Sequence, residues 1–238
     1  MPVINRVLAA LPAADLSYLR SNLTLVDLPQ RRPLEVRNRP IEHIYFLDSG
    51  FASVVNNSGN GIEVGLIGRE GMTGLPVVMG TDRSPHDIYM QQGGAGWQIE
   101  AHHLRRAMEQ SRHLHRVFVL FAHAFAIQMS FTVIANGRNN TQERLARWLL
   151  MAHDRSGRDL TLTHKSLSLL LGVRRPGLTI ALQMLKDAKA IRSSRGVISI
   201  TDRRRLRKLA HGSYGASEAE LERMLAEAAG AAAKMPRS

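Results

Sequence analysis

Two short amphipathic patterns that meet at a glycine constrain the fold of this chain more than any other feature. Residues 160–200 read LTLTHKSLSLLLGVRRPGLTIALQMLKDAKAIRSSRGVISI. Thr163 suits the cap of a short helix, whose expected buried face is Leu167, Leu170 and Leu171. Gly172 then supplies a tight turn. The segment therefore predicts two helices that cross at a steep angle.

The second helix of this pair divides into an apolar face and a face that can read DNA. It is expected to begin near Arg174, with Pro176 in the first turn, where no intrahelical N–H bond is needed. One arc of the helical wheel holds Leu178, Ala181, Leu182 and Leu185. The opposite arc holds Arg175, Pro176, Thr179, Ile180 and Gln183. A helix-turn-helix needs this division, because one face anchors the helix while the other enters a major groove.

Charge is concentrated in the same part of the chain. Residues 140–211 carry 16 lysines and arginines against 5 acidic residues, a net +11 of the chain's total of +12. A hairpin is predicted at Arg192-Ser-Ser-Arg-Gly, between Ile191 and Val197–Ile200, and its two arginines, Arg192 and Arg195, lie in a wing well placed to meet phosphates. A solubilising surface is the plain alternative, but it would not need to be confined to one segment. The distribution favours a polyanion-binding domain beside a near-neutral one.

The residues before this domain predict a sheet followed by a long helix. Short apolar runs between residues 24 and 100, separated by glycine-rich turns, are typical of an antiparallel sandwich or jelly roll. In the following helix, residues three and four apart form a predicted seam of Val117, Leu120, Ala124, Ile127, Phe131 and Ile134. The seam suits a dimer, and burial against the chain's own sheet is the alternative. Asn140 and Glu143 resemble a capping box that opens the next helix, and a last helix is expected near Ser217.

Composition and missing motifs exclude several functions. The chain has no cysteine, which excludes disulfides, thiolate metal sites and a cysteine nucleophile. No catalytic or nucleotide-loop motif is present, and Gly68-x-x-Gly71-x-x-Gly74 lacks the lysine and hydroxyl end of a P-loop, so an enzyme is not expected. His102-His103 and His113-x-His115 lack the spacing that puts two imidazoles on one helix face, and we expect no metal or cofactor. We also expect no membrane span, because His123 and Gln128 interrupt the longest apolar run, and the interpretation is a cytoplasmic protein.

The run from Thr163 to Ile200 closely resembles the helix-turn-helix of the Crp/Fnr family of bacterial regulators. More weakly, IEHIYFLDSG resembles the strand and turn of the family's cyclic-nucleotide-binding-like β-roll, and GREGMTGLPVVMGTDRSP falls at its phosphate-binding cassette. The resemblance implies an α+β chain with an N-terminal antiparallel β-roll (jelly roll), a long dimerisation helix and a C-terminal winged helix-turn-helix. The expected divisions are a sensor domain at 1–110, the long helix at 111–139, the DNA-binding domain at 140–211 and a partly helical tail at 212–238.

The resemblance also implies a function and a set of contacts. It implies a transcriptional regulator that acts as a homodimer on a palindromic operator in double-stranded DNA, with RNA polymerase as a further partner if it activates. Arg175 matches the family arginine that contacts a guanine, and Arg174 matches a phosphate contact. Pro176 and Ile180 stand where the catabolite activator protein has base-reading residues, so the operator should differ. The full expected DNA-binding set is Thr163, His164, Lys165, Arg174, Arg175, Pro176, Gly177, Thr179, Ile180, Gln183 and Arg195.

The expected ligand site is degenerate. It comprises Gly74, Leu75, Arg83 and Ser84. Family members that bind cyclic AMP have a Gly-Glu pair that holds the ribose, whereas Gly74 is followed here by Leu75. Losing that acceptor leaves a buried diol unpaired, at a cost of ~1–3 kcal/mol. We therefore expect weak or absent cyclic AMP binding and an effector of unknown identity; the alternative is a regulator that still binds a cyclic nucleotide through the divergent cassette.

Overall fold

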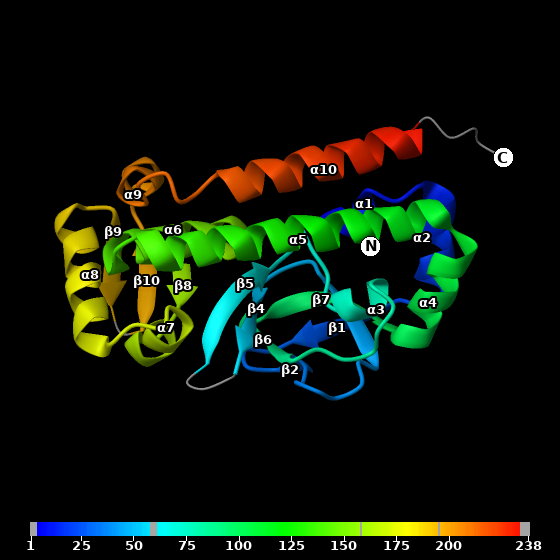
Figure 1. Ribbon diagram of the computed structural model, residues 1–238, viewed down its shortest axis with the longest axis horizontal. Coiled ribbons are helices and arrows are strands. Elements are labelled where there is room, and N and C mark those ends of the chain that lie inside the picture. The colour runs from blue at the N-terminus through cyan, green and yellow to red at the C-terminus, as the bar shows by residue number, and fades with distance from the viewer. Residues whose placement is uncertain (1–3, 58–60, 158, 195, 234–238) are drawn as a thin grey trace.

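The computed structural model describes residues 4–57, 61–157, 159–194 and 196–233 (Figure 1). Its helices are α1 (Arg6–Ala9), α2 (Ala13–Arg20), α3 (Leu75–Val78), α4 (Ala101–Gln110), α5 (Arg112–Arg138), α6 (Thr141–Ser156), α7 (His164–Leu170), α8 (Arg175–Asp187), α9 (Arg203–Leu209) and α10 (Ala216–Ala233). Its strands are β1 (Thr24–Leu28), β2 (Pro33–Glu35), β3 (His43–Leu47), β4 (Phe51–Asn56), β5 (Ile62–Ile67), β6 (His86–Gln92), β7 (Gly94–Glu100), β8 (Asp159–Thr161), β9 (Ile191–Ser194) and β10 (Val197–Ile200). The α+β fold class is confirmed.

The N-terminal strands form a β-roll of two antiparallel sheets. One sheet has the order β1-β7-β3 and the other β2-β6-β4-β5. Side chains alternate along each strand, so Ala52, Val54 and Ile88 enter the core between the sheets. Phe51 and Leu66 leave the second sheet on its other face and join the core of the C-terminal domain. The two parts of the molecule therefore share a continuous packed boundary.

Helix α5 lies against the second sheet and is fixed there by one buried amide. Gln128 accepts a hydrogen bond from the Leu66 N–H at 2.7 Å and donates to the Leu66 carbonyl at 3.1 Å, so its side chain replaces a strand partner. Gly65 makes this approach possible, because a Cβ there would lie 2.8 Å from the ring of Phe125. The long helix is thus rigidly placed on the roll.

The tail helix α10 turns back along α5. Figure 1 shows it beside α5 for much of its length, on the side away from the sheets. Leu225 and Ala228 are buried in the β-roll core, and Arg6 forms two short bonds to Glu222, of 2.5 and 2.6 Å. The sequence indicated a helix near Ser217 followed by fraying, but the helix continues through Gly230. A segment that follows the C-terminal domain therefore packs on the β-roll.

The packing of α5 corrects two expectations about that helix. Val117 and Ala124, expected in the dimer seam, are buried inside the protomer. An 18-residue window of α5 reaches a mean hydropathy of 2.0 with 33% of the window buried, so by length and composition it could cross a membrane. The expectation that no apolar stretch approaches that length was wrong. Part of the apolar character serves the core of the protomer, where Phe118, Phe121 and Phe125 of α5 are buried.

The C-terminal domain is a bundle of short helices with a three-stranded sheet of order β8-β10-β9. The capping box expected at its entrance is present, with Asn140 accepting from the Glu143 N–H and Glu143 accepting from the Asn140 N–H. Its core includes Leu167, Leu178 and Leu182 from the two crossing helices. The domain thus forms around the apolar faces that the sequence pattern indicated.

Candidate DNA-binding surface

Helix α7 presents its N-terminal residues to solvent. The Thr163 hydroxyl accepts a hydrogen bond from the Ser166 N–H at 3.1 Å, which caps the helix as expected. Behind this cap, Leu167 and Leu170 are buried. Thr163, His164 and Lys165 are exposed. All three therefore lie where a phosphate of a bound duplex could reach them.

The turn between α7 and α8 depends on Gly172. Its φ is +60°, a left-handed conformation that favours glycine, and an added Cβ would lie 2.9 Å from Ile62 of β5. The guanidinium of Arg144 on α6 donates to the carbonyl of Leu171 just before the turn. The helix pair is therefore held both from within its domain and against the β-roll.

Helix α8 divides into the two expected faces. Leu178, Ala181, Leu182 and Leu185 are buried. Arg175, Pro176, Thr179, Ile180 and Gln183 are exposed, with Ile180 at 62%. The Thr179 hydroxyl donates to the Arg175 carbonyl at 3.0 Å, and the Gln183 amide donates to Asp187 at 2.7 Å. The outer face is preorganised and uncovered by the described residues.

The two arginines at the start of α8 are exposed and unpaired within the described part of the chain. Arg174 is the N-cap residue and Arg175 begins the helix, with Pro176 next to it. Neither guanidinium has an ion-pair or hydrogen-bond partner among the residues described. Gly177 is half-buried and leaves room beside them, because nothing lies within 4 Å of an added Cβ. These arginines are therefore free to contact a nucleic acid.

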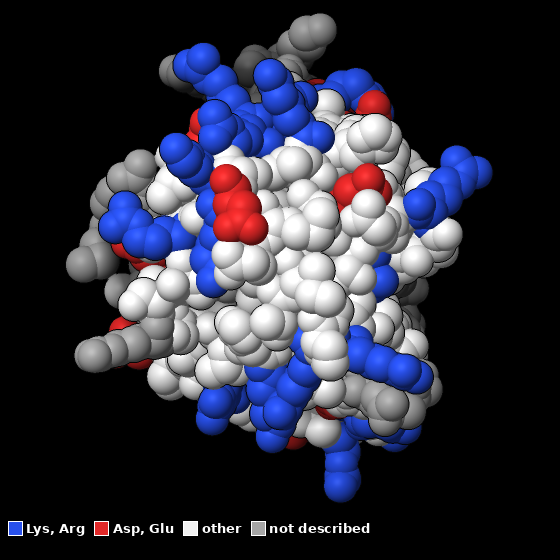
Figure 2. All heavy atoms as spheres, turned by 90° about the vertical axis from the view of Figure 1, so that its left-hand side faces the viewer, with Lys and Arg blue, Asp and Glu red and all other residues white. Residues whose placement is uncertain are grey.

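The wing and the last helix of the domain carry further basic residues. β9 and β10 form the expected hairpin, in which Gly196 has a φ of +82°; Arg195 lies outside the described residues. Arg204, Arg207 and Lys208 on α9 are exposed. Figure 2 shows lysines and arginines in groups around a largely uncharged middle on this end of the molecule. The basic surface therefore extends beyond α8 to α9.

Some basic residues of the domain have structural contacts instead. Arg203 pairs with Asp154 at 2.7 Å and donates to the Tyr214 hydroxyl at 2.7 Å. Arg147 is buried and donates to the Ser213 carbonyl at 3.0 Å. Burial lowers the pKa of this guanidinium. Net charge alone therefore overstates the number of arginines available to DNA.

The sequence interpretation missed one exposed residue beside the expected DNA-contact set. Met184 on α8 is 47% exposed next to Gln183. The helical wheel carried the signal, because position 184 follows Ile180 by four residues on the same side of the helix. Arg192, one of the two arginines of the predicted wing, is exposed.

Comparison with known proteins agrees with this geometry. The family model for the Crp-like helix-turn-helix domain matches residues 143–209, which span α7, α8, the wing and α9. This chain carries a Crp-like helix-turn-helix domain. Two solved regulators resemble the whole arrangement. One is a Crp/Fnr family protein from Eubacterium rectale, at 19% identity and a TM-score of 0.68, covering 86% of this chain and 97% of that one.

The second solved regulator is FixK2 from Bradyrhizobium japonicum, at 15% identity and a TM-score of 0.66, covering 79% of this chain and 96% of that one. At these identities the likeness shows the fold. No curated protein sequence matches the chain. The β-roll, the long helix and the Crp-like domain therefore have the arrangement of the Crp/Fnr regulators.

The polar groups of the four expected ligand residues in the β-roll have partners within the chain, unlike the two arginines at the start of α8. Gly74 and Leu75 begin α3, and Leu75 is buried. The Arg83 side chain is 58% exposed and pairs with its neighbour Asp82 at 3.3 Å. The Ser84 hydroxyl lies 3.2 Å from Nδ1 of His86. Each of these polar groups already has a partner within the chain.

A buried carboxyl stands beside the same segment. Oε1 of Glu35 accepts the Gly74 N–H at 2.5 Å, and Oε2 has no partner among the described residues. Burial raises the pKa of Glu35 to about 7. The sequence interpretation did not find this residue, because β2 and the segment around Gly74 are far apart in the chain. The Gly74 N–H therefore already donates to a carboxylate of the protein and is not available to a ligand.

A second buried carboxyl joins the β-roll to the Crp-like domain. Glu63 of β5 accepts hydrogen bonds from the Ser53 hydroxyl and from Nε1 of Trp148 on α6. Burial raises its pKa to about 8. Beside it, the ring of Trp148 lies edge-on to Phe51, with 6.1 Å between the ring centroids. Arg155 of α6 also pairs with Glu70 at 2.7 Å in a buried position. The two domains are therefore joined by specific polar contacts.

Among the described residues, two histidines and a glutamate form a cluster of possible metal ligands. Ligand atoms of Glu100, His102 and His103 lie within 4.8 Å of one another at the start of α4. Glu100 and His102 are exposed. The expectation that His102 and His103 diverge on a helix did not allow for the helix end, where Glu100 joins them. Exposed groups of this kind are common without a metal.

Proposed function

We propose that the protein is a sequence-specific, DNA-binding transcriptional regulator of the Crp/Fnr type. The observation that carries this proposal is the uncovered outer face of α8, which begins with unpaired arginines on a domain of net charge +11. A helix with its N-terminal residues exposed in this way suits the major groove. The basic groups of the surrounding surface suit the phosphates. No enzymatic role is part of the proposal.

The proposed contacts follow the exposed residues. Arg175 pairs in bidentate fashion with a guanine, and Arg174 contacts a phosphate. Ile180 has no hydrogen-bonding group and is placed to touch a thymine methyl. Thr163, His164 and Lys165 lie at the backbone beside the groove. The operator is therefore expected to combine a guanine and a thymine in each half-site.

We propose a homodimer through the part of α5 that the protomer leaves uncovered. With α10 and the sheet in place, an exposed stripe remains whose residues are alternately four and three apart: Val119, His123, Ala126, Ser130 and Val133. Val119 is 43% and Val133 70% exposed. This spacing is that of a two-stranded coiled coil. The seam is therefore displaced from the one expected from sequence, because the fold already uses Val117 and Ala124.

Selection from a random duplex library tests the DNA contacts and the dimer together. We expect a palindromic consensus with half-sites about 10 bp apart, because two recognition helices of a dimer reach successive major grooves. Affinity for the selected duplex should fall by about 10³–10⁵-fold between about 50 and 200 mM salt if 6–10 phosphates are contacted. Equal affinity for the selected and scrambled duplexes would exclude a sequence-specific regulator.

A charge placed in the exposed stripe tests the dimer separately. Ala126→Glu changes an exposed residue of α5 and should leave the protomer folded while converting the dimer to a monomer in light scattering. Leu25→Glu, at a position 44% exposed on β1, is the matched control and should stay dimeric. A dimeric Ala126→Glu protein would place the interface elsewhere.

The effector is the least specified part of the proposal. Glu35 at Gly74 and the outward pairing of Arg83 support weak or absent cyclic AMP binding. The fold does not select one ligand, since the similar regulator CLP of Xanthomonas campestris is described as c-di-GMP responsive. Isothermal titration with cyclic AMP tests the point, and low-micromolar binding would favour a regulator with a divergent cassette. A cytoplasmic location and contact with RNA polymerase remain predictions.

A further inference from the structure

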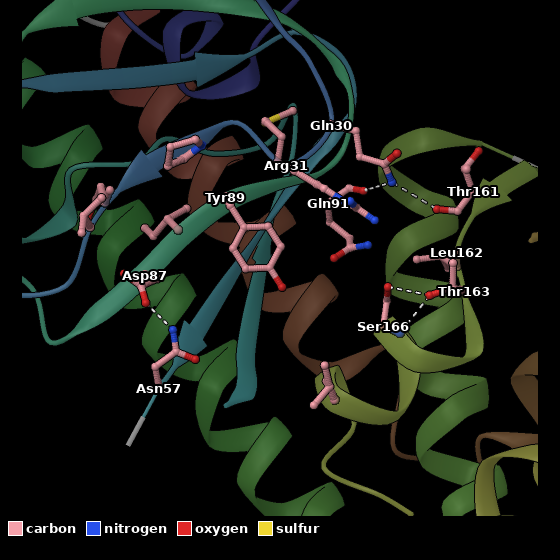
Figure 3. A pocket seen from close by; sticks show the side chains of 16 residues that line it. Gln30, Arg31, Asn57, Asp87, Tyr89, Gln91, Thr161, Leu162, Thr163 and Ser166 are labelled. Carbon is pink, nitrogen blue, oxygen red and sulfur yellow. Dashed lines mark hydrogen bonds between the residues drawn. The ribbon is translucent and has the colours of Figure 1, made fainter. Parts of the chain in front are cut away.

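A cleft separates the β-roll from the first helix of the helix-turn-helix. Its volume is 510 Å³, which lies in the range of small-molecule sites, and such sites occur preferentially between domains. Figure 3 shows Arg31, Tyr89 and Gln91 on the β-roll side facing Thr163 and Ser166. The cleft lies between the roll and α7, and Glu35, which accepts the Gly74 N–H, lines one part of it.

Several groups on the β-roll wall have no partner within the described residues. Gln91 is only 6% exposed, yet its side-chain amide makes no hydrogen bond to any part of the chain that the structure describes. The Tyr89 hydroxyl is likewise without a described partner, and burial raises its pKa to about 12, so it stays protonated. Tyr89 is half-buried, and neither polar group is among the buried side-chain atoms that lack a partner. Both groups therefore reach the solvent of the cleft, where they are available to a ligand.

Arg31 brings a positive charge to the same wall. Its backbone has a φ of +70°, which is uncommon for a residue other than glycine, and its N–H donates to the Met90 carbonyl at 2.7 Å. No acidic group pairs with its guanidinium among the described residues. Strained backbone held in this way is frequent at binding sites. The guanidinium of Arg31 therefore gives the cleft a positive charge that no described acidic residue pairs with.

The acidic and apolar groups of the cleft limit the ligand further. Asp87 is already engaged, because it accepts hydrogen bonds from the Arg37 N–H at 2.8 Å and from the Asn57 amide. Glu35 is bonded to Gly74. Leu169 and Val36 offer apolar surface, at 48% and 49% exposed. The free groups thus match an anion with a flat apolar body.

We propose that this interdomain cleft binds a small organic anion, a carboxylate or a phosphate ester on a planar apolar body. Arg31 pairs with the anionic group, Tyr89 and Gln91 hydrogen-bond to it, and the body lies against Leu169. Only the effect of the ligand on operator affinity rests on the proposed function. A ligand touching both the roll and α7 fixes the orientation of the helix pair and thereby changes operator affinity.

A second cleft shows why the first is the better candidate. It has a volume of 520 Å³ and is lined by Arg6, Arg155 and Arg203, among others. These arginines are already paired, with Glu222, Glu70 and Asp154 respectively. A ligand there would have to break existing ion pairs, whereas the cleft at Arg31 offers unpaired groups.

Binding is tested first without DNA, so that it does not depend on the proposed function. The full-length protein is titrated with phenyl phosphate, benzoate and benzylamine, and binding is followed by NMR and calorimetry. We expect the two anions to bind and benzylamine not to bind. Arg31→Gln should weaken anion binding by at least tenfold and Tyr89→Phe by a smaller factor. Arg106→Gln, an exposed arginine on α4, is the charge-matched control and should bind as the wild type does.

Each outcome decides the proposal. Tighter binding of benzylamine, or equal loss in Arg31→Gln and Arg106→Gln, would overturn the anion site. Absence of binding by both anions would overturn it as well. If the anions bind but leave operator affinity unchanged, the site stands and its regulatory role is wrong. If no DNA is bound under any condition, the proposed function fails while the cleft result is unaffected.

Discussion

The two halves of the molecule use their polar groups in opposite ways. In the Crp-like domain, Arg174, Arg175 and Thr179 point outward, and the two arginines have no protein partner among the described residues. In the segment around Gly74 of the β-roll, the corresponding polar groups are bonded within the chain, above all through Glu35. Exposed charges without a protein partner are available to another molecule, whereas groups bonded within the chain are not. The contrast separates the open surface of α8 from the closed segment around Gly74, although Oε2 of Glu35 has no described partner there.

The largest expected effect comes from cutting the contact between the two halves. Trp148→Ala removes a side chain only 4% exposed, together with the indole N–H that Glu63 accepts. We expect a loss of about 3–5 kcal/mol, or about 6–20 °C in Tm. We also expect calorimetry to show two separate transitions, because the halves no longer unfold as one unit.

A second tryptophan provides the control for that change. Trp97 lies within the β-roll and donates to Asp48 at 2.9 Å. Trp97→Ala should lower the Tm yet keep the Crp-like domain coupled to the roll. If Trp148→Ala unfolds in a single transition like the control, the halves are coupled through other contacts, such as α10.

The open surface is tested by Arg175→Ala. Loss of one bidentate guanine contact should cost about 1–3 kcal/mol of operator affinity, or about 5–150-fold, and should relax preference at one base of each half-site. Fluorescence anisotropy on operators substituted at each position measures both effects. Arg207→Ala, on α9, removes the same charge from an exposed position and should weaken binding equally on all sequences. A uniform loss in Arg175→Ala would contradict base readout.

Whether a feature could be predicted from the sequence depends on how far apart in the chain its interacting residues lie. The faces of α8, the cap at Thr163 and the capping box at Asn140 depend on residues within a few positions of one another, and the structure has them as expected. Local patterns of this kind are written directly in the sequence. The exposed and buried faces of α7 and α8 could therefore be inferred from residues 160–200, whereas the DNA contacts stay predictions.

The features that escaped the sequence analysis all depend on distant residues. Glu35 meets Gly74 across 39 positions, and Glu63 meets Trp148 across 85 positions. Helix α10 packs along α5 although the two are distant in the chain, and Arg116 donates to Glu227 across 111 positions. The short strand β2 gave no periodic signal in three residues. Hydrophobic spacing shows that a face is apolar but does not show which partner covers it.

The pH dependence of stability tests the buried junction. Burial raises the pKa of Glu63 from 4.5 to about 8 in the folded protein, so the folded state binds the proton more tightly than the unfolded chain does. Its contribution to stability is therefore fully present below pH 4.5 and is lost as the pH rises toward 8. Glu63→Gln should remove this loss and raise stability at pH 8 relative to the wild type by about 1 kcal/mol or more. Thermal melts of both proteins from pH 5 to about 9 measure this difference in stability. If the stabilities of the two proteins depend on pH in the same way, Glu63 is not a buried, protonated group.

The smallest expected effect concerns the ion pair that holds α10. Arg6 and Glu222 form a bidentate pair, but their side chains are 37% and 60% exposed, so solvent screens the attraction. A double-mutant cycle of Arg6→Ala and Glu222→Ala in urea should give a coupling of only about 0.2–1 kcal/mol. Leu225→Ala, which removes a buried side chain of the same helix, should cost about 2–5 kcal/mol. Helix α10 follows the Crp-like domain in the chain but packs on the β-roll. A coupling energy above about 2 kcal/mol would therefore mean that the ion pair, and not apolar burial, holds α10 in place and joins the two halves along α5.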